Sequence, residues 1–160
     1  MYITLHSKWN LVTDDMTSKE NYFIRKYQSI SNIPKDIPNL FILGYGNTLK
    51  KAIFPNSLTN LKSITIGNEC YKHVREFVID SLESLESVEI GYKCFRISEE
   101  ERDDGICRIT NCPNLRHLDI DYWSFEDFKS FELSNLNSIQ SIQFGDCCFK
   151  HAEEFSLKGW

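Results

Sequence analysis

The amino-acid sequence predicts a β-rich solenoid, an α/β-class repeat fold of about five turns with parallel strands. Three observations lead to this prediction: a segment that returns at a regular interval, a second short apolar segment between its copies, and a glycine at the same position in most copies. One such unit cannot bury its own apolar face. Stacked units can, because equivalent side chains then lie over one another in continuous columns. The pattern covers residues 37–160 and not residues 1–36.

The longer segment of the repeat occurs in four good copies. They are LKSITIGNECY from Leu61, LESVEIGYKCF from Leu85, LRHLDIDYWSF from Leu115 and IQSIQFGDCCF from Ile139, at steps of 24, 30 and 24 residues. A poorer copy, IPNLFILG, begins at Ile37. Apolar and polar residues alternate in each copy, which indicates a strand with Ile64 and Ile66 facing inward and Ser63 and Thr65 facing outward.

A second apolar segment lies six to eight residues before the first residue of a copy. Its residue pairs are Phe77 and Ile79, Cys107 and Ile109, Phe131 and Leu133, and Phe155 and Leu157. Alternation over so few residues predicts a second short strand in every turn of the solenoid.

The seventh position of the longer segment, where the strand is expected to end, is a glycine in three copies, at Gly67, Gly91 and Gly145, and Asp121 in the remaining copy. Because the chain must turn sharply here, we expect a positive φ at this position, which glycine adopts readily and aspartate tolerates.

The step of 30 residues contains SEEERDDG, an acidic insertion at residues 98–105. Insertions in repeats become surface loops, and a charge run in a loop is usually solvated. The aspartate spacing of a calcium-binding loop is absent, so no metal is expected there.

The four copies resemble the leucine-rich repeat pattern L-x-x-L-x-L-x-x-N-x-L. The repeat length and the Phe-x-Ile/Leu segments at Phe77, Phe131 and Phe155 are similar to the BspA-like variety of these repeats. This resemblance implies a curved solenoid with a parallel sheet on its concave side, and a function in binding another macromolecule without catalysis. The chain departs from the family at the asparagine position, which holds Glu69, Lys93, Trp123 and Cys147.

The two ends follow the pattern poorly. Residues 1–36 are interpreted as an N-terminal cap or a degenerate repeat, with YITL and WNLV as short strands and a helix beginning near Thr17 or Ser18. The last repeat, EEFSLKGW, is incomplete, with Trp160 in the column of Leu82 and Leu136. Its open edge predicts a longer array or end-to-end self-association, unless Trp160 covers it.

Composition narrows the possible partners and compartments. The net charge is −5, from 18 basic and 23 acidic residues, so no global attraction to nucleic acid or to anionic lipid is expected. No apolar run approaches the length of a membrane helix, and the N-terminus lacks the pattern of a secretory signal. The apolar content of 41% allows a core without disulfides, so the six cysteines favour a reducing, cytoplasmic location, or a cell-surface location if the chain is part of a longer protein.

Three groups of residues resemble chemical sites, and we expect none of them to be one. Cys70, Cys94 and Cys148 share one column, which suits small buried side chains. Two Cys-x-x-His pairs, from Cys70 and Cys148, are about 14 Å apart at ordinary strand spacing, too far to share a zinc ion. His117, Asp119 and Ser141 approach one another as in a serine hydrolase, but a flat strand face lacks an oxyanion hole.

The outward face of the longer strands is the predicted functional surface. It is small and polar, and two tyrosines are expected to stack at its border, a residue type favoured at interfaces. Its residues are Ser63, Thr65, Ser87, Glu89, Tyr92, His117, Asp119, Tyr122, Ser141 and Gln143. We therefore expect a non-catalytic, cofactor-free module that binds a protein, with a basic patch on the partner. The alternatives are a structural segment that stacks on copies of itself and, third, a serine hydrolase.

Overall fold

The structure is a computed structural model that describes residues 20–25, 30–44, 49–97 and 104–159. Within these residues, every helix or strand but one is a β-strand, the exception being the short 3-10 helix Ile30–Asn32. The strands are β1 (Asn21–Arg25), β2 (Asn39–Leu43), β3 (Lys51–Ile53), β4 (Ser63–Ile66), β5 (Glu76–Asp80), β6 (Ser87–Ile90), β7 (Ile106–Thr110), β8 (His117–Ile120), β9 (Ser130–Ser134), β10 (Ser141–Phe144) and β11 (Glu154–Lys158).

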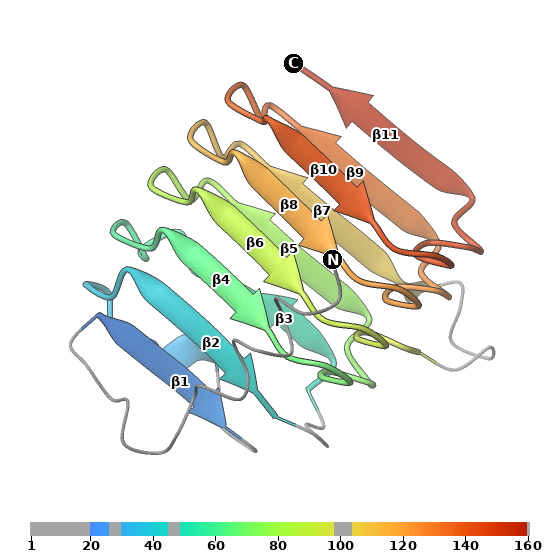
Figure 1. Ribbon diagram of the computed structural model, residues 1–160, viewed down its shortest axis with the longest axis horizontal. Coiled ribbons are helices and arrows are strands. Elements are labelled where there is room, and N and C mark those ends of the chain that lie inside the picture. Colours follow the sequence, from blue (N-terminus) through green and yellow to red (C-terminus); the bar gives the residue numbers. More distant parts are fainter. Residues whose placement is uncertain (1–19, 26–29, 45–48, 98–103, 160) are drawn as a thin grey trace.

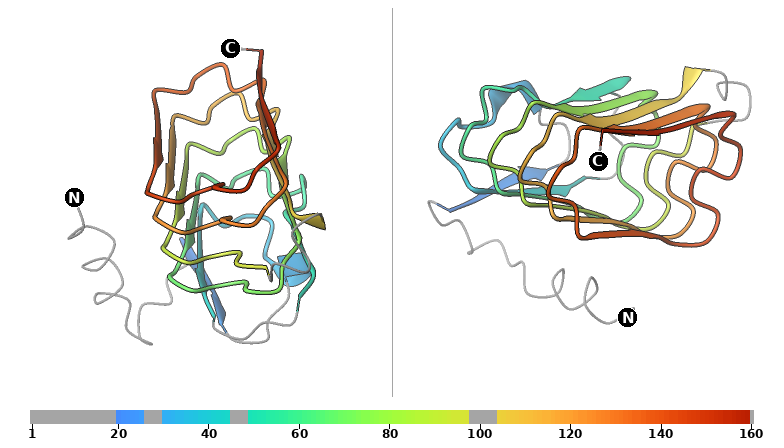
Figure 2. Two further views of the ribbon diagram at one scale, coloured as in Figure 1. Left: turned by 90° about the vertical axis from the view of Figure 1, so that its right-hand side faces the viewer. Right: turned by 90° about the horizontal axis from the view of Figure 1, so that it is seen from above.

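The strands form two sheets that face each other across the core (Figures 1 and 2). The six-stranded main sheet has the order β1-β2-β4-β6-β8-β10, and the five-stranded second sheet has the order β11-β9-β7-β5-β3. From β3 onward the chain alternates strictly between the two sheets, and the paired strands are parallel. The predictions of a β-rich fold and of parallel strands are therefore confirmed.

The strand register follows the repeat read from the sequence. Ser63 pairs with Ser87 at the step of 24, and Ser87 pairs with His117 at the step of 30. In the poorer copy Leu40 pairs with Ile64, as expected. The six extra residues of the acidic insertion therefore leave the ladder unbroken. Most of that insertion lies outside the described residues, and Asp104 is paired with Arg75 at 3.5 Å.

The core consists of stacked columns of equivalent side chains. The leucines that begin the repeats are fully buried at Leu61, Leu85 and Leu115. A second column places Phe125 between Phe95 and Phe149, with ring centroids at 4.4 and 5.0 Å and planes within 7° of parallel. Each such ring contributes about 1.5–3 kcal/mol through burial. These columns hold the two sheets together.

The sheets are not curled, in contrast to the concave sheet that the family resemblance implies (Figure 2). From β2 to β11, each repeat contributes one strand to each sheet. Neighbouring strands lie about 4.8 Å apart in both sheets, whereas a helix on one side would need about 10 Å. Equal spacing on the two sides gives no reason for the stack to bend.

The expected helix near residue 17 is wrong where it can be compared. Asn21–Arg25 is a strand, and it pairs with β2 in the same parallel ladder, Phe23 opposite Phe41. Tyr22, Phe23 and Ile24 are aromatic and β-branched residues, which suit a strand, and the tertiary pairing overrides the local helix signal. Thr17, Ser18, the segments YITL and WNLV, and Trp160 lie outside the described residues.

The expected reason for the glycine column is also wrong. Among the described glycines only Gly159 has a positive φ, at 69°. A Cβ on Gly91 would collide with Asn68 Oδ1 and lie 2.8 Å from Asn68 N, and a Cβ on Gly145 would lie 2.7 Å from Tyr122 Cα. The glycines therefore serve the close approach of one turn to the preceding one.

Positive φ angles recur two and four residues after the glycine column, and also at Ser81, Asn111 and Asn135, directly after strands β5, β7 and β9 of the second sheet. Lys93 and Phe95 have φ of 54° and 56°, and the same pair of positions repeats in the other turns. This conformation directs their N–H groups along the stack, Lys93 N to Tyr122 O at 3.1 Å and Phe95 N to Cys70 O at 3.1 Å. The hydrogen bonds between turns hold residues in a conformation that otherwise costs about 1–3 kcal/mol.

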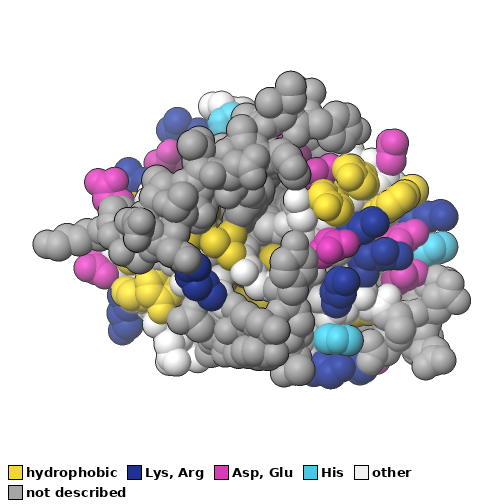
Figure 3. Space-filling model, turned by 60° about the horizontal axis from the view of Figure 1, so that its bottom comes forward, with side chains coloured by type: hydrophobic (Ala, Val, Ile, Leu, Met, Phe, Trp, Pro, Cys, Tyr) yellow, Lys and Arg dark blue, Asp and Glu magenta, His cyan; other side chains and the backbone are white. Residues whose placement is uncertain are grey.

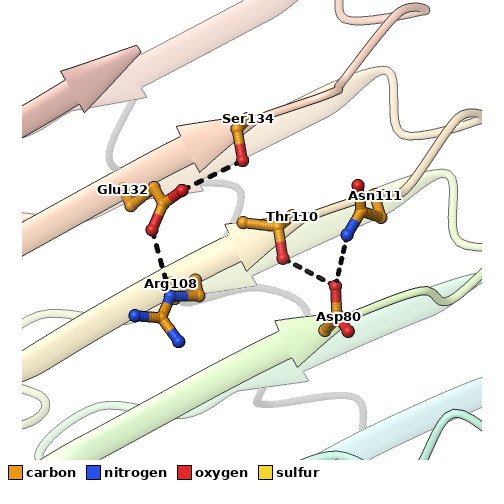
Figure 4. A network of polar contacts seen from close by, with 6 residues as sticks. All are labelled: Asp80, Arg108, Thr110, Asn111, Glu132 and Ser134. Carbon is orange, nitrogen blue, oxygen red and sulfur yellow. Dashed lines mark hydrogen bonds and ion pairs between the residues drawn. The ribbon is translucent and has the colours of Figure 1, made fainter. Parts of the chain in front are cut away.

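The outer face of the second sheet carries a polar network that the sequence did not suggest (Figure 4). Asp80 Oδ1 accepts hydrogen bonds from Thr110 Oγ1 at 2.7 Å and Asn111 Nδ2 at 2.8 Å, and Asn135 Nδ2 donates to Asn111 Oδ1 at 2.7 Å. Glu132 accepts from Arg108 Nε at 3.1 Å. Asparagines therefore do link successive turns, but not at the position that the family pattern assigns. They do so here on the second sheet and also on the side of the main sheet, where Tyr92 N donates to Asn68 Oδ1 at 3.1 Å and Asn39 Nδ2 donates to Asn21 Oδ1 at 3.1 Å.

Candidate functional site

Eight of the ten predicted binding residues lie in two rows along the outer face of the main sheet, and Tyr92 and Tyr122 lie in the turns that follow β6 and β8. The strand pairings join Ser63, Ser87, His117 and Ser141 in one row and Thr65, Glu89, Asp119 and Gln143 in the other. The sequence thus placed these residues correctly relative to one another. Thr65 is only 6% exposed and offers little surface, whereas the others are half-buried or exposed.

The second row continues toward the N-terminal end of the sheet with two aromatic residues. Phe41 pairs with Thr65, and Phe23 stacks on Phe41 with ring centroids 5.1 Å apart. The row therefore runs from aromatic to acidic to amide side chains. Sequence reasoning missed Phe23 because the surrounding residues were interpreted as a helix.

His117 and Ser141 are in contact, with 2.9 Å between His117 Nδ1 and Ser141 Oγ. Both lie on the strand face, and the Ser141 N–H donates to the carbonyl of Arg116 at 3.0 Å. A serine nucleophile needs nearby donors for a developing oxyanion. The backbone donor of Ser141 is instead engaged in the strand ladder.

The two tyrosines at the border stack, as the sequence predicted. The ring centroids of Tyr92 and Tyr122 are 5.2 Å apart and the ring planes are within 5° of parallel. Trp123 meets Tyr122 edge to face at 5.5 Å. Lys93 Nζ lies 5.0 Å from the centroid of the Trp123 ring and 6.0 Å from that of Tyr92. We call Tyr92, Lys93, Tyr122 and Trp123 the aromatic cluster.

Sequence reasoning assigned neither Trp123 nor Lys93 to the site. Both occupy the asparagine position of the family pattern, from which both depart. Their left-handed backbone, with φ of 60° and 54°, lies in turns that follow the strands of the main sheet. The alignment of Lys93 with Trp123 at one repeat step was the signal available, because equivalent positions of adjacent turns lie side by side.

A cleft of 470 Å³ adjoins the aromatic cluster and is lined by Tyr122, Trp123, Asp146 and Cys147. Trp123 is 39% exposed. The turn that carries Tyr122 and Trp123 is held to the turn of Asp146 by the hydrogen bond from Trp123 N to Asp146 O, at 2.8 Å. Two aromatic walls and a carboxylate therefore meet at one edge of the main sheet.

The cysteine column is a packing column with hydrogen bonds. Cys94 Sγ donates to Gly67 O at 2.9 Å, and Ser124 Oγ in the same column donates to Gly91 O at 2.7 Å. Cys148 Sγ donates to Asp121 O at 2.9 Å. All six cysteines are free thiols, and burial raises the pKa of Cys70 and of Cys148 to about 11. Where the structure describes the chain, no group of three or more His, Cys, Asp and Glu is placed to hold a metal ion.

Acidic and basic side chains are interspersed on the described surface, as one view of it shows (Figure 3). Several pair across neighbouring strands of the second sheet, such as Lys51 with Glu76 at 2.9 Å and Arg108 with Glu132 at 3.1 Å. Exposed pairs of this kind contribute about 0–1 kcal/mol each. Among the described side chains visible in this view, no group forms a patch of one sign.

Comparison with models of protein families, with curated proteins and with solved structures found no match. In the described residues, the structure contains no helix whose length and hydropathy would suit a bilayer crossing.

Proposed function

We propose that this chain is a leucine-rich-repeat-like solenoid of the BspA-like kind and a non-catalytic module that binds another protein through the outer face of the main sheet. The observation that carries the proposal is the aromatic cluster beside the cleft. Aromatic residues are enriched at protein interfaces because they provide large, rigid contact area, and those that dominate affinity lie in well-packed positions.

The architecture supports the proposal in two ways. Parallel strands at a constant register present equivalent residues side by side, which gives an extended surface with little backbone freedom. The stacking of Tyr92 on Tyr122 orders both rings before binding, so that little side-chain entropy remains to be lost. Glu89 and Asp119 make the middle of this face acidic, so a basic patch on the partner complements it.

The experiment is capture of a protein partner from a lysate of the source cell by the immobilised chain. The double variant Tyr92→Ala and Tyr122→Ala should lose capture while its circular dichroism spectrum stays unchanged. The matched control is Arg108→Ala with Glu132→Ala, which removes an exposed pair from the second sheet and should retain capture. Retained capture by the tyrosine variant, or equal loss in the control, would count against binding through the main sheet.

A second function, stacking on copies of the same chain, is favoured by the edge strands β10 and β11. Ile142, Phe144, Phe155 and Leu157 are 36–55% exposed there, although they belong to the inward columns. An open apolar edge in two sheets at once is a template for further strands. Sedimentation should then show growth with concentration, which Leu157→Lys suppresses and Ile106→Lys, in the middle of the second sheet, does not. A monomer at all concentrations contradicts this function.

A further inference from the structure

The cleft exists because side-chain size falls from one turn to the next. Asp146 follows Tyr92 and Tyr122 in their column, and Cys147 follows Lys93 and Trp123 in theirs. The backbones of the two turns are in direct contact, since Gly145 packs against Tyr122 without room for a Cβ. The large rings of Tyr122 and Trp123 are therefore followed, in the next turn, by the two short side chains of Asp146 and Cys147. The hollow of 470 Å³ lies where a third planar group would continue the stack.

The walls of the cleft attract positive charge. Tryptophan is the aromatic residue that binds cations most strongly, through the negative face of its ring. Within the molecule itself, Lys93 Nζ already lies 5.0 Å from the centroid of Trp123. The indole remains 39% exposed, so part of its surface is open to a second group.

Asp146 adds an exposed carboxylate to the same cleft. A ring wall and a carboxylate together match one side chain better than any other. The guanidinium of arginine is planar and weakly hydrated, stacks on aromatic faces, and donates two parallel hydrogen bonds to a carboxylate. The ammonium of lysine is compact and strongly hydrated and can do only part of this.

We propose that this cleft binds an arginine side chain of a partner polypeptide. The guanidinium stacks on the ring of Tyr122, where it continues the stack of Tyr92 on Tyr122, meets the Trp123 ring at close to a right angle, and donates hydrogen bonds to the carboxylate of Asp146. The inference deepens the proposed function and rests on it, because it names the group that the binding face recognises. Asp119 and Glu89, further along the same face, add to its attraction for a basic segment.

The test is a nuclear magnetic resonance titration of the full chain with the peptide acetyl-Gly-Arg-Gly-amide. The readout is the indole N–H signal of Trp123, one of three tryptophans, which a Trp123→Phe variant identifies by its loss. We expect this signal to shift more than those of the other two. The peptide with citrulline in place of arginine keeps the planar group without the charge and should bind about tenfold more weakly, equal to about 1.4 kcal/mol. The lysine peptide should also bind more weakly.

Asp146→Asn should weaken the arginine peptide about tenfold, since it removes the charge but keeps the size of the side chain. The matched control is Glu83→Gln, an exposed carboxylate between β5 and β6 that should leave binding unchanged. An unshifted Trp123 signal overturns the proposal, and so does equal binding of the citrulline or lysine peptide, or unchanged binding to Asp146→Asn.

The two proposals fail separately. If the arginine peptide does not bind but the double tyrosine variant still loses its partner, the arginine inference is wrong and protein binding through this face stands. If the peptide binds as expected but the tyrosine variant still captures its partner, the cleft recognises arginine and the wider face is not the docking surface.

Discussion

Replacing Gly145 with alanine tests why the glycine column exists. A Cβ at this position would clash with Tyr122 N and lie 2.7 Å from Tyr122 Cα and 2.9 Å from the carbonyl carbon of Asp121. Carbon atoms pack at about 3.5–4.0 Å, so the last turn must move away from the preceding one by several tenths of an ångström. Overpacking of this kind costs about 1–3 kcal/mol. The alanine also restricts the unfolded chain, which returns about 0.4–1 kcal/mol.

We therefore expect Gly145→Ala to lower the free energy of unfolding by about 1–2 kcal/mol. The assay is denaturation in urea, monitored by circular dichroism, with the slope of the transition compared between variants. Asp146→Ala, at the next and exposed position, is the control and should change the free energy by less than about 0.5 kcal/mol.

A second substitution separates steric contact from backbone conformation. If Gly145 were required for a positive φ, asparagine would be tolerated better than alanine, because asparagine adopts that conformation more readily. If close approach is the reason, Gly145→Asn should destabilise at least as much as Gly145→Ala. A stable Gly145→Ala variant, or an asparagine variant more stable than the alanine variant, refutes the steric explanation.

Three further predictions concern the core, the polar network and the thiols. Phe125→Ala should destabilise the fold by about 3–5 kcal/mol, because its fully buried ring is stacked on both faces; a loss below about 2 kcal/mol in urea denaturation would contradict this. Hydrogen bonds from Thr110 and then Asn111 lower the pKa of Asp80, so its charged form stabilises the fold above the unfolded pKa of about 4, and this stabilisation is lost as pH falls through the lower folded pKa. Asp80→Asn should therefore cost about 0.5–1 kcal/mol at pH 7, and this cost should vanish once the pH falls below the lowered folded pKa and Asp80 is protonated; a difference that persists in that acid limit argues against the network. Iodoacetamide should modify the partly exposed Cys147 in the native protein before Cys94, whose pKa burial raises; equal rates in mass spectrometry would show that the column is open.

Much of the strand ladder could be predicted because it depends on equivalent residues lying over one another. The steps of 24 and 30 residues fixed which residues pair, and the pairing of Ser87 with His117 followed even though the loop between them is unequal. The stacking of Tyr92 on Tyr122 followed from the same reasoning. In a repeat protein, residues that are distant in the sequence but equivalent in successive repeats lie side by side, so the repeat register predicts their contacts.

Other features could not be predicted, because they depend on the backbone conformation and on the contacts between turns, which the repeat pattern does not specify. The glycines are needed for space, and the turns gain their positive φ at Lys93 and Phe95, through hydrogen bonds to neighbouring turns. The strand at Asn21–Arg25 has weak local alternation and is stabilised by its partner β2. The burial of Thr65 likewise did not follow from an alternation that pointed it outward.

The cleft was missed for a related reason. Trp123 and Lys93 both replace the asparagine of the family pattern, and that pattern does not predict their contact with each other. Their contact at 5.0 Å becomes visible only when the turns of successive repeats are stacked. Asp146 and Cys147 matter because their side chains are smaller than those of Tyr122 and Trp123 at the equivalent positions of the preceding turn. A repeat pattern records what the copies share and not such differences between them.

The strand order also bears on how such a molecule can grow. Each inner strand bonds only to the strand one unit before it and the strand one unit after it. Duplicating residues 111–134 and inserting the copy after Ser134 would add one strand to each sheet. The chain would then continue from the same position of the repeat as before. Slippage or unequal crossover in the coding DNA can therefore add or remove whole repeats, and with them part of the surface. The sequences of the neighbouring repeats need not change.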